Sequence, residues 1–309
     1  MAPPKKWTPS PAVEKLPLAV RKELRDDWES VKGDHEAKIS ELLGKPYVLA
    51  FNANEVYPYA DSSSSKEYPG RVFVGYVEGL IAAIQWYLDE FEEDGKIHFN
   101  DAVSKGEITL VVDEKGSDGP VCSADIKDGV FRIIFRYDCL GYNQQSTKDY
   151  IVAAVDSVPR EGFPVEVKNS IRSYYDPEID EVRQQIADIL ALPDVVLDAN
   201  FTGVYEAMLA GKPSSRSWKS EIGKVALANF KEGLLNSLEK QGFKGDDMLQ
   251  EGLAEVLTSK TFKLSVVPKL EKGSVNETFV RDGVCYLQTT PDNWWYNVPN
   301  MGDGLVNLL

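Results

Sequence analysis

Histidine and cysteine are scarce in this sequence, with two histidines and three cysteines among 309 residues. Cys122, Cys139 and Cys285 are odd in number and show no metal-ligand spacing, which disfavours a disulfide framework and a zinc site. Reduced thiols fit a cytoplasmic protein. A Ser-His-Asp or Cys-His site would have to use His35 or His98, and no nucleophile motif accompanies either histidine.

Long apolar runs are also missing. The most apolar window, residues 72–88, is interrupted by Glu78 and Gln85 and is too short to span a bilayer. Residues 1–11 are rich in proline and lysine and have no apolar core of the kind found in signal peptides. The glycines of residues 116–119 are typical of a hairpin turn and not of a phosphate-binding loop. We therefore expect no membrane contact, no metal and no other cofactor.

The chain has fewer basic than acidic residues. It contains 34 Lys and Arg and 49 Asp and Glu, which gives a net charge of −15. A surface this negative repels phosphate backbones, so we expect no nucleic-acid partner. Apolar residues form 43% of the chain, which is ordinary for a folded protein. The length suits two hydrophobic cores, each built from about 150 residues.

A hairpin signature that occurs twice dominates the remaining pattern. Asp128-Gly129 and Asp282-Gly283 each lie between runs rich in β-forming residues, which predicts two tight hairpins. The offset is 282 − 128 = 154 residues. The same offset relates other pairs: Leu110 and Leu264, Val112 and Val266, Asp138 and Asp292, Tyr142 and Tyr296.

This repetition predicts an α+β fold with two tandem, internally duplicated domains. Each domain is expected to have helices packed on one face of a mostly antiparallel sheet. The predicted boundaries are a flexible tail at 1–15, a first repeat at 16–143, a linker at 144–163 and a second repeat at 164–309.

Each repeat is expected to contain a long helix followed by a short one. The long helices are predicted at about 71–92 and 220–241, with Gly79 and Gly233 at equivalent places. A glycine inside a helix costs about 1 kcal/mol relative to alanine, so both glycines predict a close backbone approach, most simply by the sheet. The short helices are predicted to open at Asn100 or Asp101 and at Asp246 or Asp247. Three strands then form a predicted meander: Ile108–Glu114, Val121–Ile126 and Val130–Tyr137, answered by Phe262–Lys269, Glu277–Val280 and Val284–Thr290.

The candidate site residues are polar and aromatic side chains that recur in both repeats. One interpretation is structural, because Asp and Asn end strands by bonding their own backbone and Tyr covers a core with its hydroxyl outward. The other is that they line a groove for a polar ligand. The pairs are Tyr57 and Tyr205, Asp138 and Asp292, Tyr142 and Tyr296, Asn143 and Asn297.

The first functional hypothesis is a soluble binding or interaction protein, a monomer or weak dimer. Its duplicated domain would bind a small polar or aromatic ligand, a glycan or a protein partner in a groove. The alternative is an enzyme of the isomerase, cyclase or lyase type that needs neither metal nor nucleotide and uses Asp and Tyr acid–base groups in an apolar pocket. The sequence identifies no catalytic residue and leaves open whether the protein is an enzyme.

Overall fold

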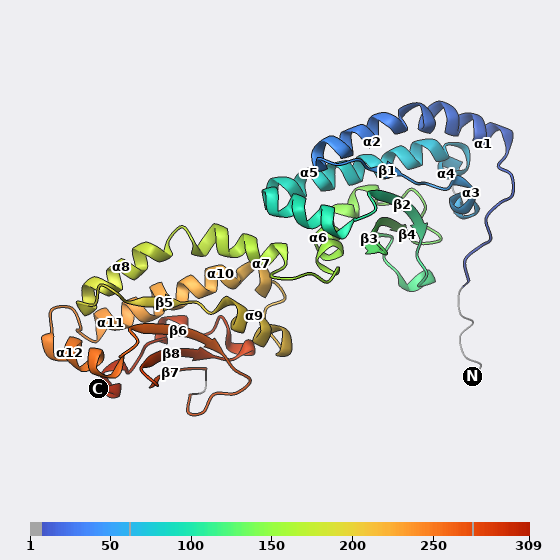
Figure 1. Ribbon diagram of the computed structural model, residues 1–309. Helices are drawn as coiled ribbons and strands as arrows, with labels where there is room; N and C mark the ends of the chain where they lie inside the picture. The colour runs from blue at the N-terminus through green and yellow to red at the C-terminus, as the bar shows by residue number, and fades with distance from the viewer. Residues whose placement is uncertain (1–7, 62, 274) are drawn as a thin grey trace, which may run out of the picture. The chain divides into compact units, whose positions relative to one another are not determined.

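The computed structural model describes residues 8–61, 63–273 and 275–309. The chain forms two compact units, Met1–Val165 and Glu166–Leu309. Both units are of the α+β type, and each has its own four-stranded sheet (Figure 1). Within the described residues, no helix is both long and apolar enough to cross a membrane.

The first unit opens with a long helical segment that contains a π-helical turn. Val20, Leu24 and Trp28 recur at helical spacing and are buried. Leu43 ends α2, and Gly44 follows it in the left-handed conformation that commonly ends a helix. The elements are α1 (Leu18–Glu23), the π-helical η1 (Leu24–Glu29), α2 (Ser30–Leu43), β1 (Val48–Leu49), α3 (Ala53–Val56), η2 (Tyr57–Tyr59), α4 (Ser63–Glu67), α5 (Pro69–Ala102), β2 (Glu107–Val112), η3 (Gly116–Asp118), β3 (Cys122–Lys127), β4 (Val130–Phe135), η4 (Gln144–Ser146) and α6 (Thr147–Asp156).

The second unit also has a helical segment, a short strand, further helices and then three strands, and it ends in short turns where the first unit has α6. Its helices also include π-helical turns, in η5 and η6. The elements are α7 (Val165–Ser170), η5 (Ile171–Tyr175), α8 (Ile179–Leu190), β5 (Val196–Asp198), α9 (Phe201–Ala210), α10 (Trp218–Ala228), η6 (Asn229–Leu235), α11 (Asn236–Lys240), α12 (Asp247–Val256), β6 (Thr261–Val266), β7 (Asn276–Arg281), β8 (Val284–Thr289) and the short turns η7 (Pro291–Asn293), η8 (Val298–Asn300) and η9 (Leu305–Leu308).

Both sheets are mixed, which corrects the prediction of mostly antiparallel sheets. The strand orders are β1-β2-β4-β3 and β5-β6-β8-β7. Only the last pair of each sheet, β3 with β4 and β7 with β8, is antiparallel; the other pairs are parallel. The predicted meander is therefore wrong. The hairpin forms as expected, but its second strand lies between the other two, beside β2 or β6.

The strand registers of the two sheets correspond residue by residue. Glu107 of β2 pairs with Val130 of β4, and Thr261 of β6 pairs with Val284 of β8. Both residues of the second pair lie 154 positions after those of the first (261 − 107 and 284 − 130). Asp128 and Asp282 each adopt a left-handed backbone conformation in the hairpin turn.

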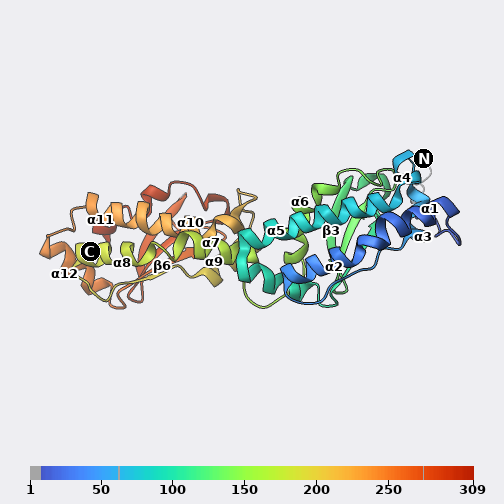
Figure 2. The ribbon, with the colours of Figure 1, turned by 90° about the horizontal axis from the view of Figure 1, so that it is seen from above.

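Helices cover one face of each sheet (Figures 1 and 2). In the first unit α2 and α5 lie over the sheet, and in the second unit α8, α10 and η6 do so. Along β4, Phe131, Ile133 and Phe135 are buried and alternate with half-buried residues, as expected when one face meets a helical layer. Cys285 and Leu287 on β8 are buried in the same way.

The predicted start of a short helix at Asn100 or Asp101 is wrong. Residues 93–102 are already helical, because α5 kinks at Glu92 (φ 50°) and continues to Ala102. In the second unit the corresponding break separates α11 from α12, and Asp246 caps α12 as predicted by accepting a hydrogen bond from the Leu249 amide.

The predicted tail and the predicted linker both contact the first unit, which the sequence did not indicate. Of the predicted tail, residues 1–7 lie outside the described residues. Ser10 donates its amide to the Tyr59 hydroxyl at 2.8 Å, and Val13 donates to the Asn54 carbonyl at 2.9 Å. The predicted linker, residues 144–163, contains η4 and α6, and α6 packs on α5 and β3.

The two helix glycines do mark close approaches, but the chain that approaches is not the sheet. A Cβ atom on Gly79 would overlap the carbonyl oxygen of Gln144, in the loop that follows β4. A Cβ atom on Gly233 would lie 2.8 Å from the carbonyl oxygen of Val298, in the loop that follows β8. Gln144 and Val298 are again 154 residues apart (298 − 144). The loop leaving the last strand is therefore docked on the central helix in both units.

We predict opposite effects for two Gly→Ala substitutions inside helices of the first unit. Gly79→Ala should lower the free energy of unfolding by about 1–3 kcal/mol, because its methyl group overpacks the Gln144 backbone. Gly33→Ala, where nothing lies within 4 Å of the new methyl group, should raise it by up to about 1 kcal/mol by favouring the helix. Urea unfolding followed by circular dichroism measures both, and equal effects would contradict the proposed contact.

Candidate functional site

The structure places the eight predicted residues at corresponding ends of the two sheets. In each unit they follow the carboxyl ends of parallel strands, which is where open sheets with helices commonly bind ligands. Tyr57 lies in η2 after β1, and Tyr205 lies in α9 after β5. The other six lie in the loops after β4 and β8: Asp138, Tyr142 and Asn143, and Asp292, Tyr296 and Asn297.

Several of these side chains have local structural contacts. Asn143 and Asn297 both adopt φ of 52°, a conformation that Asn tolerates better than most residues. Asp138 accepts a hydrogen bond from Arg136 at 2.6 Å, which lowers the pKa of its carboxyl group. Asp292 accepts one from Thr290 at 2.6 Å.

The tyrosines differ in exposure. Tyr142 and Tyr296 are 53% and 58% exposed, while the ring of Tyr205 packs on Trp218 at 5.5 Å between centroids. These contacts join the eight residues to their local surroundings and not to one another, so the groove that they would form stays a prediction.

A candidate site lies nearby in the second unit, at the end of β5. A hollow of about 400 Å³ opens there, ahead of α9. Its lining combines a buried phenol, a carboxylate, an amide and a hydroxyl with apolar groups. The lining residues are Tyr175, Leu197, Asp198, Ala199, Asn200, Phe201 and Thr202.

The strand registers identify the corresponding place in the first unit. Val48 and Val196 pair with the first residues of β2 and β6, which themselves correspond. Counting three residues onward from each, Phe51 corresponds to Ala199. A phenyl ring in one unit thus stands where the other has only a methyl group.

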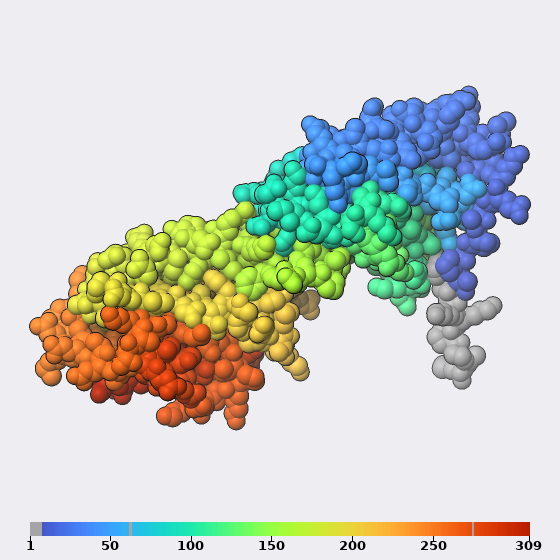
Figure 3. Space-filling model, viewed as in Figure 1, coloured from blue at the N-terminus to red at the C-terminus, as the bar shows by residue number. Residues whose placement is uncertain are grey.

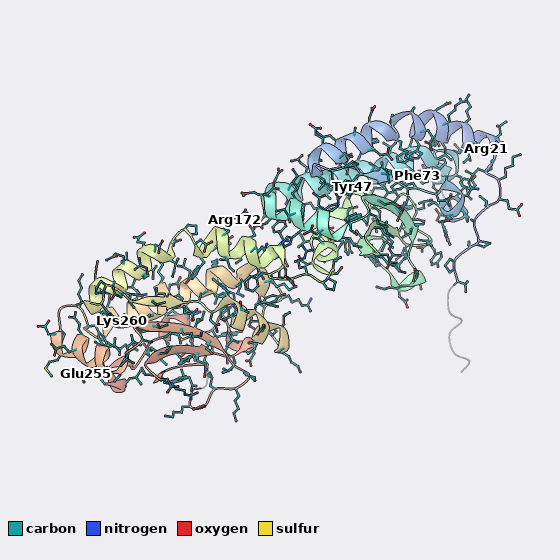
Figure 4. The ribbon with its side chains drawn as sticks, in the orientation of Figure 1. Arg21, Tyr47, Phe73, Arg172, Glu255 and Lys260 are labelled. Atoms are coloured by element: carbon teal, nitrogen blue, oxygen red, sulfur yellow. The ribbon has the colours of Figure 1, made fainter. Side chains whose placement is uncertain are left out.

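Aromatic side chains fill that place in the first unit. Trp28 of η1 stacks on Phe51 with centroids 5.3 Å apart and planes 11° apart, and Phe73 meets both rings edge-on. Phe73, labelled in Figure 4, belongs to α5 and is buried. In the second unit the ring of Tyr175 in η5 meets Phe201 edge-on, and Ala199 offers it no second ring.

Tyr175 is the most informative residue of the hollow. Its side chain is 8% exposed, and its ring meets Phe201 edge-on at 4.9 Å. Burial raises the pKa of the Tyr175 hydroxyl well above its usual range, and the nearby Asp198 carboxylate adds to the rise. The hydroxyl is therefore a protonated donor at neutral pH.

Asp198 is oriented by two partners. One carboxylate oxygen accepts the Asn200 amide at 2.8 Å, and the other accepts from Lys263 of β6 at 2.9 Å. Both side chains of the ion pair remain partly exposed, at 37% for Asp198 and 34% for Lys263. Carboxylate oxygens have several lone pairs, so Asp198 keeps acceptor capacity towards the hollow.

The start of α9 contributes unused backbone donors. Asn200 precedes the helix at φ 46° and makes no side-chain cap bond; its side-chain amide donates instead to the Leu264 carbonyl at 3.3 Å. The first amides of a helix have no acceptor within the helix, and here they begin at Phe201 and Thr202, which line the hollow. The first turn carries no acidic residue, so the positive end of the helix dipole is not neutralised from within α9.

Two further hollows lie in the first unit. One, of about 570 Å³, runs along β2, β3 and β4, and its Arg132 is paired with Asp125 at 2.7 Å. The other, of about 480 Å³, lies between η1 and α5, where Arg71 pairs with Asp27 at 3.1 Å. The adjoining helices α1 and α2 form an outer surface of this unit (the dark blue atoms of Figure 3).

Comparing the two repeats for their differences would have indicated the hollow from sequence. The eight predicted residues are ones that both repeats share, and Asn200 stands out in the sequence only as part of a shared pattern. The two halves differ at three corresponding positions near the hollow: Trp28 corresponds to Tyr175, Ala50 to Asp198 and Phe51 to Ala199.

The cysteines are buried in both units. Burial raises the pKa of the Cys122 and Cys285 thiols to about 12, which keeps both protonated at neutral pH. Thiols are poor nucleophiles in that form. In the described ranges no three His, Cys, Asp or Glu side chains are grouped so that they could hold a metal ion.

We predict that the buried thiols destabilise the fold at alkaline pH. The pKa of a thiol is about 9 in the unfolded chain, whereas that of Cys285 in the folded protein is about 12. The free energy of unfolding should therefore be greatest below pH 9 and should fall as the pH rises from 9 to 12. The loss should reach about 3 kcal/mol by pH 11. Cys285→Ala should show a shallower decline in urea unfolding between pH 8 and 11, and a decline equal to that of the wild type would refute this origin.

Comparison of the chain with family models, with curated proteins and with solved structures finds no match. The case for a function therefore rests on this chain's own residues. Among the surfaces described above, the hollow ahead of α9 combines a largely buried tyrosine, a partly exposed carboxylate and the start of a helix.

Proposed function

We propose that the protein binds a small molecule and that its second unit carries the binding site, in the hollow ahead of α9. One observation carries the proposal: two aromatic rings, a carboxylate and a side-chain amide, those of Tyr175, Phe201, Asp198 and Asn200, line one hollow of about 400 Å³.

We also infer that the two units arose by duplication of one ancestral unit. The shared strand order, the matching registers and the two glycine contacts at the same offset support this inference. On this view the first unit retains a filled aromatic core where the second has acquired a cavity. The second unit is then the specialised one, and its site arose by substitution on a scaffold that the first unit still shares.

The chemistry of the hollow supports binding without assigning a reaction. Tyr175 is a donor and Asp198 is an acceptor, and Phe201 offers an aromatic edge. Lining of this kind, apolar with a few fixed polar groups, is typical of small-molecule sites. The volume of about 400 Å³ falls in the range of such sites.

Refilling the hollow should weaken binding. Ala199→Phe introduces the ring that the first unit has at this place, and it should weaken retention of any ligand at least about tenfold, because the ring occupies volume that the ligand needs. The full-length protein is equilibrated with the low-molecular-mass fraction of a cell extract, and native mass spectrometry detects what it retains.

Leu209→Phe is the matched control, because it places a similar ring on an exposed position of α9, where Leu209 is 55% exposed. This variant should retain the same ligand as the wild type. A ligand held equally by Ala199→Phe would place the site elsewhere. Retention of no small molecule by the wild type would refute the proposed function.

A further inference from the structure

The outer face of α1 and of the first turn of η1 is basic, although the chain as a whole carries a net charge of −15. Leu18 is 74% exposed on this face. An open groove of about 730 Å³ surrounds it, which we call the α1 surface, and its lining residues are Leu18, Ala19, Arg21, Lys22 and Arg25 (Arg21 is labelled in Figure 4). A surface that joins apolar and basic side chains favours an acidic partner with an apolar side chain of its own.

The acids nearest in sequence only partly offset this positive charge. Glu23, the acid of α1, is half-buried and accepts hydrogen bonds from two backbone amides at the start of α5, at 2.7 and 3.2 Å, so it faces inwards. Asp26 pairs with Arg25 at 2.7 Å, but the Arg25 side chain remains 70% exposed. Arg21 and Lys22 are both exposed. The α1 surface therefore keeps a positive charge.

A surface of α12 in the second unit has the opposite charge at the same spacing. Met248 is 83% exposed, and Glu251 and Glu255 are exposed three and seven residues further along the helix. Leu18 is followed by arginines at these same two distances. The ten residues of α12 include a third acid, Asp247, and no basic residue. Side chains at this spacing share one face of a helix, so Met248, Glu251 and Glu255 form one exposed surface, which we call the α12 surface (Glu255 is labelled in Figure 4).

We propose that the α1 surface of one copy of this chain binds the α12 surface of a second copy. In that contact the two arginines meet the two glutamates, and Leu18 and Met248 cover each other from water. Surfaces with matching patterns of opposite charge attract each other and reject surfaces of like charge. A second copy is the partner that the charges favour, because every copy presents both surfaces. The contact uses neither the hollow ahead of α9 nor its lining, so it is independent of the proposed function.

The negative net charge does not prevent this contact. Whole copies repel one another over long distances. At an ionic strength of about 0.15 M, however, charges farther apart than about 8 Å are largely screened from each other, whereas groups paired in the contact are much closer. The attraction between the two surfaces therefore outlasts the repulsion between the copies.

The contact joins two different surfaces, so each copy keeps one unused surface after its first contact. A contact of this type closes into a ring or extends into a chain of copies. Only one face of a short helix contributes on each side, so the buried area falls in the class of weak, transient interfaces. We therefore expect the mean mass of the particles to rise continuously with protein concentration.

Sedimentation equilibrium of the full-length protein at an ionic strength of about 0.15 M tests the contact. The mean mass of the wild type should rise as the protein concentration is raised from about 10 µM to about 1 mM, the range in which weak contacts form. Two charge-reversed variants should stay single chains, because like charges then face each other and the affinity falls at least about tenfold. They are Arg21→Glu with Lys22→Glu, and Glu251→Lys with Glu255→Lys.

A mixture of the two charge-reversed variants gives the deciding measurement. The intact α12 surface of the first variant meets the intact α1 surface of the second, so an equimolar mixture should recover association. Lys212→Glu with Arg216→Glu is the matched control, because it makes the same change of charge at exposed positions of the loop between α9 and α10. This control should associate as the wild type does.

Three results would each overturn the contact: a wild type that stays a single chain, a charge-reversed variant that associates as the wild type does, and a mixture that fails to recover association. A wild type that stays a single chain but binds vesicles of phosphatidylserine and phosphatidylcholine, with this binding lost in Arg21→Glu with Lys22→Glu, would assign the α1 surface to an anionic lipid instead. None of these results changes the test of the hollow, which measures a retained small molecule.

Discussion

Each unit depends on the contact between its central helix and the loop that leaves its last strand. At Gly79 and Gly233 the helix has no side chain, and a carbonyl oxygen of that loop occupies the space. Any other residue would push the loop away from the helix that covers the sheet. Because both glycines lie at the same place, the two units share this packing although most of their side chains differ. The rest of each core assembles around a helix held in this position.

The two units differ at the carboxyl end of their first strands. In the first unit Trp28 and Phe51 stack on each other. In the second unit Tyr175 and Ala199 line a hollow of about 400 Å³. A filled aromatic cluster favours stability, whereas an open hollow forgoes those contacts. The difference between the units is therefore the starting point of the proposed function.

The hairpins could be predicted from local sequence, but the order of the strands in each sheet could not. The Asp-Gly turns correctly indicated hairpins, because the left-handed conformation at Asp128 and Asp282 is a local property of the chain. Local sequence does not determine which strand of the hairpin pairs with β2 or β6. Placing β4 and β8 in the centre gives the most apolar strand of each hairpin a neighbour on both sides, which a meander does not. That choice is made by burial across the whole sheet.

The sequence alone determined the α+β composition, the long helices, the hairpins and the recurrence of one residue pattern in both halves, because all of these follow from spacing along the chain. It also singled out eight candidate residues that follow strands in the fold. Only the tertiary structure decided the mixed strand order, the loop that meets Gly79 and Gly233, and the hollow beside Tyr175. Each of these depends on which distant side chains share a volume, and a single small residue such as Ala199 has that consequence only when its neighbours in space are known.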